Sequence, residues 1–428
     1  MTSALRTDHY ELTMVEAALR EGAADRPCVF EVFGRSLPEG RRYGVVGGTG
    51  RLLEALGRFR FDDDDIDHLR RTGVVDDRTL DWLAGYRFTG DITGYAEGEL
   101  YFPGSPVLTF EGRFAEVVVL ETLVLSILNH DTAVASAAAR MSAVAEGRPI
   151  IEMGSRRTHE ESAIAAARAA YLTGFATTSN LAAGQLYGIP TAGTSSHAFV
   201  LLHGDEEAAF RAQVAALGVG TTLLVDTYDV LEGIRRAVAA AGPDLGAIRI
   251  DSGDLAILAR RARELLDSLG ARKTRIVVTG DLDEYAIAAL AAAPVDVYGV
   301  GTSVVTGSGH PTAAFVYKMV ELDGVPVAKR SARKGTLGGK KTVIRRHDHN
   351  GTMTEEVIVV RGAAMPPDEP RDRRPQVPLV SGGELVEPVT TLDESRDHHA
   401  MVMATLPLTG FSLRRGEPAI PTVYHEEH

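Results

Sequence analysis

The hydrophobic residues in the middle of the chain come in short runs that alternate with longer amphipathic stretches rich in alanine and leucine. This alternation predicts repeated βα units that build a parallel sheet. Seven runs between about residues 147 and 305 are expected to be strands. They are residues 149–153, 174–177, 189–192, 221–226, 247–250, 275–279 and 295–300. The sequence therefore predicts an α/β fold with a βα barrel, closed or incomplete.

The clearest predicted helix follows the fifth of these strands. Its apolar residues recur at spacings of three and four, and Gly270 supplies a stop signal. The positions that form this stripe are Leu255, Leu258, Ala262, Leu265 and Leu269. The opposite face carries several charged residues, so we expect a helix on the outside of the barrel.

The segments on either side of the barrel have a different pattern. Residues 1–130 mix strand-like and helical stretches, which predicts an N-terminal α+β domain that precedes a catalytic barrel at 131–310. Residues 311–428 are expected to form a C-terminal extension that packs on the N-terminal domain. The acidic run from Asp62 to Asp65 is interpreted as a solvated loop or helix start, not as a metal site.

Composition narrows the class of protein. With 44% hydrophobic and 24% charged residues the chain is typical of a soluble globular protein. A net charge of -13 argues against a nucleic-acid partner. The one cysteine, Cys28, excludes an intrachain disulfide and is expected to be a small buried hydrophobe.

The apolar segments also argue against a membrane protein. The longest apolar run, Val117 to Leu128, contains Glu121 and is shorter than the ~20 residues that a spanning helix needs. The first twenty residues carry several charges and do not fit a secretory signal. We therefore expect a cytoplasmic protein.

Polar residues follow the predicted strands, where a βα barrel has its active site. After the first strand, Arg156 and Arg157 are suited to hold a carboxylate or phosphate, although a surface pair at a helix start explains them equally well. After the third strand, a loop of small residues at 193–196 ends in His197. Its amides and hydroxyls suit an oxyanion, and the imidazole is either catalytic or structural.

Carboxylates follow the fifth and sixth strands. Asp251 and Asp281 are expected to face one mouth of the barrel, where they suit ribose hydroxyls, Mg²⁺ or a developing positive charge. The alternative is helix N-capping, which Ser252, Asp254 and Asp281 can also perform. After the seventh strand, residues 299–303 are a glycine-containing loop suited to phosphate. The stretch TTLLVDT at 221–227 lacks the second acidic residue and the T-[ST]-G ending of a known ribose-binding loop, so it is not interpreted as one.

Five ordered motifs together resemble the nicotinate phosphoribosyltransferase family along nearly the whole chain. They read TDHYELTM at 7–14, EMGSRR at 152–157, GTSSHAFV at 193–200, RIDSGDL at 249–255 and GVGTSVVT at 299–306. The resemblance implies a type II phosphoribosyltransferase fold, with an incomplete α/β barrel and an N-terminal domain. It also implies a homodimer with shared active sites, Mg²⁺ as cofactor and ATP as co-substrate.

The resemblance also implies roles for single residues. His197 matches the histidine that ATP phosphorylates, while Thr194 and Arg249 match residues that contact nicotinate. Tyr10 matches an aromatic residue that stacks on the pyridine ring from the other subunit. The phosphate of the phosphoribosyl group is expected at Gly301 and Thr302.

Three further residues complete the expected site. Asp251 and Asp281 resemble carboxylates that hold ribose hydroxyls and help to place Mg²⁺, with Asp251 counted as catalytic beside His197. Arg156 lies where the family keeps a positive charge for anionic groups. The sequence does not identify the metal ligands themselves.

The expected reaction is an ATP-coupled, ligase-type synthesis of nicotinate mononucleotide from nicotinate and phosphoribosyl pyrophosphate, in NAD salvage. Ser179 stands where related nicotinamide enzymes have an aspartate, which favours nicotinate. A quinolinate or nicotinamide phosphoribosyltransferase and a non-catalytic ligand-binding homologue are the alternatives. A Schiff-base barrel enzyme is disfavoured because no lysine ends a predicted strand.

Overall fold

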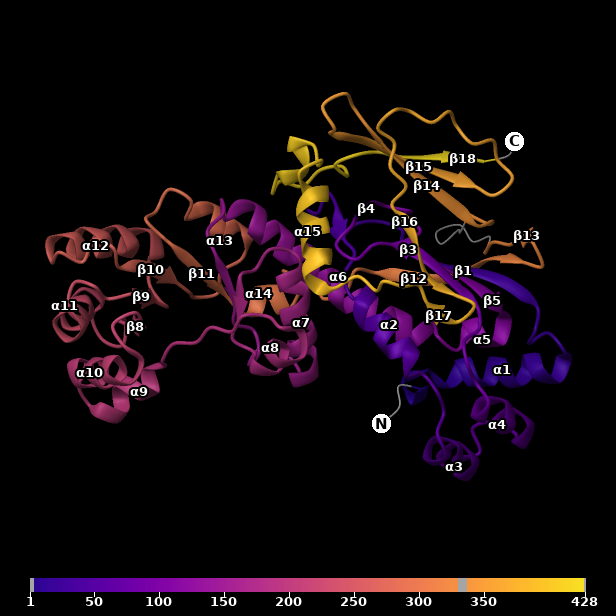
Figure 1. Cartoon of the computed structure of the whole chain (residues 1–428), viewed down its shortest axis with the longest axis horizontal. Coiled ribbons are helices and arrows are strands. Elements are labelled where there is room, and N and C mark those ends of the chain that lie inside the picture. Colours follow the sequence, from indigo (N-terminus) through magenta and orange to yellow (C-terminus); the bar gives the residue numbers. More distant parts are fainter. Residues whose placement is uncertain (1–3, 330–336, 427–428) are drawn as a thin grey trace. The chain divides into compact units, whose positions relative to one another are not determined.

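A computed structural model describes residues 4–329 and 337–426 of the chain (Figure 1). Two compact units make up this part of the protein. One, called here the sheet unit, combines residues before 137 with residues after 309, and the other, the barrel unit, spans residues 137–309. The long helix α6 (Glu121–Val144) begins in the sheet unit and ends in the barrel unit.

The sheet unit is built on a seven-stranded sheet with the order β13-β12-β1-β5-β3-β16-β17. The N-terminal strands β1, β5 and β3 form its centre, and strands from residues after 309 flank them on both sides, because β12 pairs with β1 and β16 pairs with β3. The strands are β1 (Pro27–Gly34), β3 (Asp91–Tyr95), β5 (Leu108–Arg113), β12 (Phe315–Leu322), β13 (Val325–Pro326), β16 (Gln376–Ser381) and β17 (Glu384–Leu385). Residues after 309 therefore share one sheet with the N-terminal residues.

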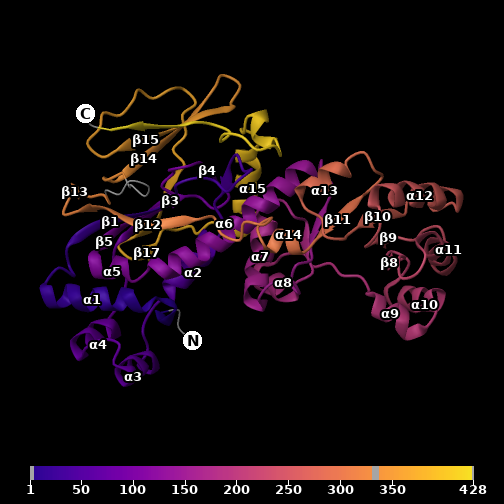
Figure 2. The same ribbon diagram turned by 180° about the vertical axis from the view of Figure 1, so that it is seen from behind.

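Two smaller sheets complete the strands of this unit. One contains β14 (Lys341–His347), β15 (Met353–Val360) and β18 (Thr422–His425), and the other contains β2 (Gly44–Val45) and β4 (Leu100–Tyr101). The three-stranded sheet lies over one side of the large sheet, and α1 and α5 lie on its other side (Figure 2). Aromatic side chains of neighbouring strands meet in the core, where Phe30 stacks on Tyr317 with 4.9 Å between ring centroids.

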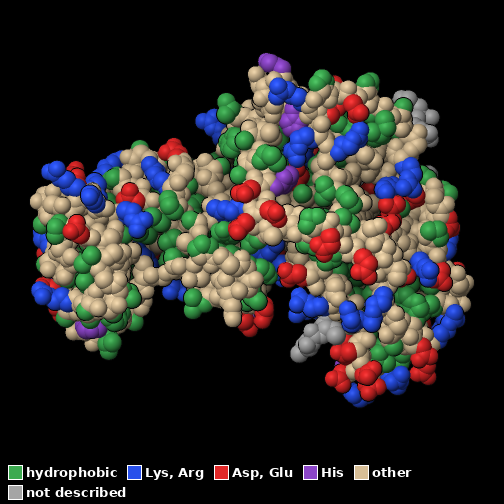
Figure 3. Space-filling model, viewed as in Figure 1, with side chains coloured by type: hydrophobic (Ala, Val, Ile, Leu, Met, Phe, Trp, Pro, Cys, Tyr) green, Lys and Arg blue, Asp and Glu red, His purple; other side chains and the backbone are tan. Residues whose placement is uncertain are grey.

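Helices surround these sheets, and several begin at residues that the sequence marks as caps. Asp62 caps α3 through a reciprocal capping box with Asp65, so the acidic run is confirmed as a solvated helix start. Acidic side chains gather over α3 and α4 in Figure 3. The helices are η1 (Ala4–Arg6), α1 (His9–Glu21), α2 (Thr49–Gly57), α3 (Asp63–Thr72), α4 (Asp77–Ala84), α5 (Phe114–Val118), α15 (Leu392–Met403) and η2 (Leu408–Phe411).

Cys28 and the apolar run before residue 129 each have a defined place in the sheet unit. Cys28 is buried and lies in the hydrophobic core, as expected. The apolar run, expected to be too short for a membrane span, is part of a longer helical stretch. Phe114–Val144 is long and apolar enough to cross a membrane, but 61% of its most apolar window is buried inside the protein. Such burial is typical of a core helix.

A buried ionic cluster joins β14, β15 and the residue before β4 in the sheet unit. The fully buried Arg345 donates to Glu99 at 2.6 Å and to Glu356 at 2.9 Å. Burial raises the pKa of Glu99, but the Arg345 charge, with His398 and Arg373, outweighs burial and lowers that pKa to about 2. Glu99 therefore stabilises the fold above its unfolded pKa of about 4.3, and this contribution is lost as the pH falls toward 2.

Replacing Arg345 with methionine is expected to lower the free energy of unfolding by about 3 to 5 kcal/mol at neutral pH, because two buried carboxylates lose their cation. Urea unfolding followed by circular dichroism measures the change. The loss is expected to shrink at about pH 4, where the unpaired carboxylates take up protons. Equal losses at both pH values would contradict this explanation.

The barrel unit contains one six-stranded, parallel sheet with the order β7-β6-β11-β10-β9-β8. Its strands are β6 (Ile150–Glu152), β7 (Thr177–Thr178), β8 (Thr222–Leu224), β9 (Ala247–Ile250), β10 (Arg275–Val278) and β11 (Val297–Val300). Its helices are α7 (Glu160–Leu172), α8 (Leu181–Tyr187), α9 (His197–His203), α10 (Glu206–Leu217), α11 (Val230–Ala241), α12 (Leu255–Ser268), α13 (Glu284–Ala289) and α14 (Thr302–Val305).

The predicted third strand is the main difference from the expected barrel. Residues 189–192 form only an isolated bridge between Thr178 and Thr191. Pro190 lacks an N–H group and so cannot donate to a ladder at this point. The sheet is therefore an incomplete barrel of six strands, where the sequence predicted seven. The predicted outer helix is confirmed as α12, which Asp254 caps and which ends before Gly270 in the left-handed conformation.

Candidate active site

The polar residues expected at the strand ends lie at the carboxyl edge of the barrel sheet. Parallel pairing of β8, β9 and β10 aligns this edge, because Leu224 pairs with Arg249 and Arg249 pairs with Val277. Residues that follow neighbouring strands are therefore brought close together. Two adjoining pockets are found there, both lined by residues of the barrel unit alone.

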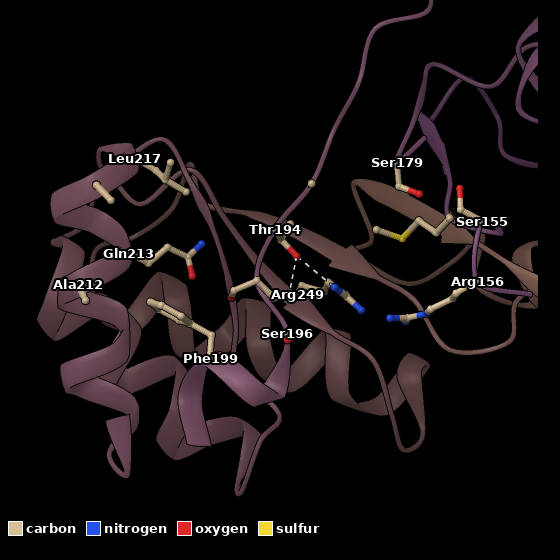
Figure 4. A pocket seen from close by; sticks show the side chains of 14 residues that line it. Ser155, Arg156, Ser179, Thr194, Ser196, Phe199, Ala212, Gln213, Leu217 and Arg249 are labelled. Carbon is tan, nitrogen blue, oxygen red and sulfur yellow. Dashed lines mark hydrogen bonds between the residues drawn. The ribbon is translucent and has the colours of Figure 1, made fainter. Parts of the chain in front are cut away.

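The larger pocket has a volume of about 670 Å³ and has a polar and an apolar end. Figure 4 shows Arg249 and Arg156 with their guanidinium groups pointing toward each other, with Ser155 and Ser179 nearby. Phe199 of α9 and Leu217 of α10 lie on the other side of the 193–196 loop. The lining residues are Met153, Ser155, Arg156, Ser179, Gly193, Thr194, Ser195, Ser196, Phe199, Ala212, Gln213, Ala216, Leu217 and Arg249.

The smaller pocket has a volume of about 150 Å³ and shares Met153, Arg156 and Arg249 with the larger one. It brings both expected carboxylates together with the glycine loop after β11. Its lining is Met153, Arg156, Arg157, Arg249, Asp251, Thr279, Gly280, Asp281, Gly299, Gly301 and Thr302. Two neighbouring pockets that share the cations of Arg156 and Arg249 suit two anionic ligands that bind side by side.

Arg249 is the centre of the polar network between the pockets. Its side chain is only 10% exposed and donates from all three nitrogens. Nε donates to the Thr279 hydroxyl at 3.0 Å, Nη1 to the Thr194 hydroxyl at 3.1 Å and Nη2 to the Asp251 carboxylate at 3.0 Å. These contacts fix the plane of the guanidinium. A cation that is fixed in orientation and largely shielded from solvent binds a carboxylate strongly.

Asp251 is kept ionised by this network. Burial raises its pKa, but hydrogen bonds from Thr279 and Arg249, together with the charges of Arg249 and His197, outweigh burial and lower the pKa. Asp251 is therefore a carboxylate throughout the physiological range. A fixed negative charge at this position can hold hydroxyl groups or stabilise positive charge.

Asp281 and its neighbours distinguish the two interpretations of the strand-end carboxylates. Asp254 caps α12 and Asp283 caps α13, so the capping explanation holds for Asp254 alone among the three expected candidates. Asp281 is exposed in the left-handed region, with a φ of 48°, and lines the smaller pocket. Gly280 permits this turn, since a Cβ atom there would lie 2.5 Å from the carbonyl oxygen of Asp251.

His197 is the first residue of α9 and is half-buried beside the strand that ends at Leu224. Its Nδ1 lies 3.1 Å from the Thr227 hydroxyl, and its Nε2 lies 3.9 Å from the Asp226 carboxylate. Both ring nitrogens thus face oxygen atoms of the loop after β8. This arrangement sets the orientation of the imidazole.

Asp226 is a residue of this site that sequence analysis missed. Its side chain is 1% exposed. Oδ2 accepts hydrogen bonds from the Asp251 amide at 2.9 Å and the Ser252 hydroxyl at 2.8 Å. Oδ1 is buried and has no hydrogen-bond partner among the described residues. A buried carboxylate oxygen without a partner is costly, so Oδ1 is available to interact with the neighbouring imidazole.

A second missed group links the loops after β6 and β7. The buried Glu152 accepts a hydrogen bond from the Thr178 hydroxyl at 2.6 Å and another from the Gly154 amide. The Asn180 amide donates to the Ser155 hydroxyl at 3.0 Å. These bonds hold the two loops that carry Arg156 and Ser179. Hydrogen bonds between loops that are distant in sequence leave no signal in residue patterns.

The remaining expected residues are placed differently. Arg156 lines both pockets, whereas Arg157 lines only the smaller one. Gly301 and Thr302 lie at the start of α14 and line the smaller pocket. Tyr10 lies on α1 in the sheet unit, is 45% exposed and lines neither pocket.

Comparisons with known proteins identify the family of the chain. The family profile described as nicotinate phosphoribosyltransferase (NAPRTase) N-terminal domain matches residues 5–129. The nicotinate phosphoribosyltransferase pncB1 of Mycobacterium tuberculosis strain CDC 1551 is 62% identical over 426 residues, which cover 98% of this chain and 94% of the relative. The nicotinate phosphoribosyltransferase of Bacillus subtilis is 36% identical and covers 80% of this chain and 72% of its own length.

Solved structures show the same architecture. Human nicotinic acid phosphoribosyltransferase has a TM-score of 0.83 with 27% identity, and the alignment covers 98% of this chain and 97% of the human chain. The nicotinate-nucleotide pyrophosphorylase of Pyrococcus furiosus has a TM-score of 0.79 with 24% identity over 94% of this chain and 95% of its own, which concerns the fold alone. The fold is thus that of the type II phosphoribosyltransferases, with a parallel half-barrel sheet. Within that class, the chain belongs to the nicotinate phosphoribosyltransferase family.

Proposed function

We propose that this protein makes nicotinate mononucleotide from nicotinate and phosphoribosyl pyrophosphate in NAD salvage, with ATP hydrolysis coupled through a phosphohistidine. The observation that carries the proposal is the buried Arg249 network between two adjoining pockets. The larger pocket suits a small aromatic carboxylate, and the smaller one suits a phosphorylated sugar. Similarity to the nicotinate phosphoribosyltransferase of M. tuberculosis supports the choice of substrates.

The pyridine carboxylate is proposed to lie between Arg249 and Arg156, with the Thr194 hydroxyl as a further donor. Figure 4 supports this placement because both guanidinium groups point into the same space. Paired cations make bidentate hydrogen bonds with a carboxylate and fix the plane of the attached ring. The ring nitrogen then faces the smaller pocket, where the sugar is bound.

In the proposed reaction the ring nitrogen forms a bond to the anomeric carbon, and the bond from that carbon to the pyrophosphate oxygen breaks. Positive charge develops on the sugar ring as the leaving group departs. Asp251 and Asp281 line the smaller pocket and are proposed to hold ribose hydroxyls and to stabilise this charge. Gly301 and Thr302 offer a backbone amide and a hydroxyl to the sugar phosphate.

Mg²⁺ is the proposed cofactor, and the residues present fit it. No cluster of three or more metal-ligating side chains is found within 4–329 and 337–426. Mg²⁺ usually keeps several waters and takes one or two carboxylates together with substrate phosphates, so Asp251 and Asp281 suffice. When bound, the ion neutralises charge on the pyrophosphate leaving group.

His197 is proposed to receive the γ-phosphoryl group of ATP on a ring nitrogen, with ADP released, and water later removes the group as phosphate. The half-buried imidazole is accessible to such a group, and Thr227 and Asp226 hold the ring. Asp226 is the proposed partner of the charged ring because its Oδ1 has no other partner among the described residues.

Replacing Asp226 with asparagine is therefore expected to lower the ATP-stimulated rate by about tenfold to 100-fold, because the charged imidazole loses its counter-charge. The rate without ATP is expected to fall much less. Initial rates with and without ATP measure both effects. Asp229→Asn is the matched control, since Asp229 only caps α11 and asparagine caps equally well. Equal losses with and without ATP would contradict an orienting role for Asp226.

Ser179 is proposed to contribute to the choice of nicotinate over nicotinamide. It lines the larger pocket near Arg156, where an added carboxylate would repel the nicotinate carboxylate and accept a hydrogen bond from an amide. In Ser179→Asp, kcat/KM for nicotinate is expected to fall by about tenfold to 100-fold. Ser179→Asn is the control, because asparagine has the shape of aspartate without its charge. It is expected to change nicotinate use far less. An unchanged ratio of nicotinate to nicotinamide use in Ser179→Asp would contradict the placement.

The proposed assembly is a cytoplasmic homodimer in which Tyr10 of one copy covers the pyridine ring bound by the other. Two features support it: Tyr10 is half exposed, and α9 and α10 expose Leu201, Leu202 and Leu217, of which Leu217 lines the larger pocket. Exposed large apolar side chains in contiguous patches often mark a protein interface.

The experiment that tests the function offers nicotinate, nicotinamide or quinolinate to the protein with phosphoribosyl pyrophosphate, ATP and Mg²⁺. Chromatography and mass spectrometry identify the product, and released CO₂ is measured in parallel. Nicotinate mononucleotide formed from nicotinate without CO₂ is the expected result. Product from quinolinate with CO₂, or no product from any acceptor, would overturn the proposal.

A further inference from the structure

We infer that Glu284 is a positioning residue, which holds the segment 301–309 in place through the hydroxyl group of Ser308. This segment follows β11 and is called here the phosphate turn. The role of Glu284 rests on the proposed function, in which Gly301 and Thr302 bind the phosphate of the phosphoribosyl group. Glu284 is the first residue of α13, and Ser308 follows α14. Both residues belong to the barrel unit.

The phosphate turn consists of the short helix α14 and a loop that folds back onto it. The amide of Ser308 donates to the carbonyl oxygen of Ser303 at 2.7 Å, which closes the loop. The helix has only four residues, and a helix of this length has little stability of its own. The backbone that presents Gly301 and Thr302 therefore depends on contacts that the rest of the barrel unit supplies.

Ser308 has an unusual backbone conformation for a residue with a side chain. Its φ is 51°, in the left-handed region, and its neighbours Gly307 and Gly309 have φ of 61° and 84°. A residue other than glycine persists in this region only where surrounding contacts hold it. The Ser308 hydroxyl makes such a contact, because it donates to Oε2 of Glu284 at 2.6 Å. Glycine would adopt this conformation without strain, so the hydroxyl explains the serine.

The carboxylate of Glu284 is buried and is itself held by a cation. Its side chain is 4% exposed, and its Oε1 accepts a hydrogen bond from Nε of Arg140 at 3.1 Å. Arg140 lies on α6, and its side chain is 5% exposed, so the two charges compensate each other away from solvent. A carboxylate that is fixed through one oxygen is a rigid and strong acceptor for the Ser308 hydroxyl at the other.

Glu284 also connects the two loops that line the smaller pocket. Asp281 lies three residues before it in the chain, and Asp283 between them caps α13. The Glu284 side chain then reaches the phosphate turn, whose Gly301 and Thr302 line the same pocket as Asp281. A shift of the turn relative to α13 would therefore change the distance between the phosphate site and the carboxylate proposed to hold the ribose. Such distances decide how well a preformed site fits its ligand.

Loss of this tether should weaken the binding of phosphoribosyl pyrophosphate and leave nicotinate binding nearly unaffected. Ser308→Ala is expected to raise KM for phosphoribosyl pyrophosphate by about three- to tenfold, the effect of one lost hydrogen bond, with kcat and KM for nicotinate close to native. A purely structural role would lower the amount of active protein and leave both KM values unchanged. Ser268→Ala is the matched control, because that exposed hydroxyl donates to the carbonyl oxygen of Leu265 on α12 at 2.7 Å, and it should have native KM values.

The test is a double-mutant cycle of Ser308→Ala with Glu284→Gln in the full-length protein. Isothermal titration calorimetry with Mg²⁺ measures Kd for phosphoribosyl pyrophosphate and needs no turnover. Glu284→Gln keeps the shape of the side chain and removes its charge, so it weakens the bond from the hydroxyl. The double variant should bind no more weakly than the weaker single variant. If Ser308→Ala raises Kd equally in the native and Glu284→Gln backgrounds, the hydroxyl does not act through Glu284 and the inference is wrong.

The same titrations separate the possible failures. If the native protein binds no phosphoribosyl pyrophosphate, the proposed function fails and the role of Glu284 with it. If the native protein binds it and Ser308→Ala has the native Kd, the role of Glu284 alone is overturned. Ser308→Gly lacks the hydroxyl but adopts the left-handed conformation without strain, so it should bind as weakly as Ser308→Ala. A native Kd in Ser308→Gly would attribute the effect to backbone strain and would also overturn the tether.

Thermal unfolding of each variant shows whether it folds. If Glu284→Gln does not fold, the two Ser308 variants still decide, since a native Kd in either one contradicts the tether.

Discussion

A His197→Ala variant is expected to lose all stimulation by ATP, with the rate of nicotinate mononucleotide formation at saturating ATP reduced by on the order of 100-fold or more. The reason is that alanine cannot carry the phosphoryl group that couples ATP hydrolysis to the transfer. The imidazole is half-buried and its ring nitrogens face Thr227 and Asp226, which sets the orientation of the ring. Steady-state product formation with and without ATP measures the effect.

His203 offers a matched control for this substitution. It ends the same helix, α9, and its Nδ1 lies 2.9 Å from the Phe199 carbonyl oxygen. His203→Ala is expected to retain the native ratio of rates with and without ATP. A His197→Ala protein that still responds to ATP would show that another group accepts the phosphoryl, or that ATP acts without a covalent intermediate.

An Arg249→Ala variant is expected to lose about 3 kcal/mol of nicotinate binding, which is a rise of roughly 100-fold in KM. The buried guanidinium is the cation between the two pockets, and its loss also leaves the Asp251 carboxylate without its ion pair. kcat/KM for nicotinate measured at fixed phosphoribosyl pyrophosphate tests the expectation. A lysine at this position should recover only part of the loss, because an ammonium group cannot make the planar set of three contacts.

Arg275→Ala is the control for Arg249. Arg275 is exposed and begins β10, whereas the site lies beyond the carboxyl ends of the strands. Its removal should leave KM for nicotinate unchanged. If Arg249→Ala changes KM for phosphoribosyl pyrophosphate but not for nicotinate, the pyridine carboxylate is bound elsewhere.

Much of the fold could be predicted from the sequence because its apolar runs have the lengths and spacings of buried strands. The predicted boundaries of the strand 247–250 agree with β9, whose four residues are all buried. The prediction of a strand at 189–192 was wrong. Hydrophobic periodicity does not take into account that Pro190 lacks a backbone N–H donor. The residues after 310 were expected to pack on the N-terminal domain, but the pairing of β12 with β1 in one sheet could not be predicted, because strand partners depend on packing that only the folded chain brings about.

Part of the candidate site could be predicted from the rule that the active site of a βα barrel lies at the carboxyl ends of its strands. Residues directly after parallel strands converge, so Asp251 and Asp281 were found from position alone, whereas Arg249, which lies within β9, was found through the family resemblance; the roles of all three remain proposals. Asp226 was missed because its segment was compared with a loop of a different phosphoribosyltransferase fold. Its importance lies in the buried oxygen beside His197, which no pattern of residue types reveals.

The proposed phosphohistidine is tested most directly by incubating the native protein with γ-labelled ATP, digesting it, and locating the label by tandem mass spectrometry under conditions that preserve phosphohistidine. We expect a phosphoryl group on the peptide that contains His197, turned over when nicotinate and phosphoribosyl pyrophosphate are added, and a weaker signal in Asp226→Asn. A protein that forms nicotinate mononucleotide with ATP stimulation but carries its label on another residue, or carries none, would contradict this proposal.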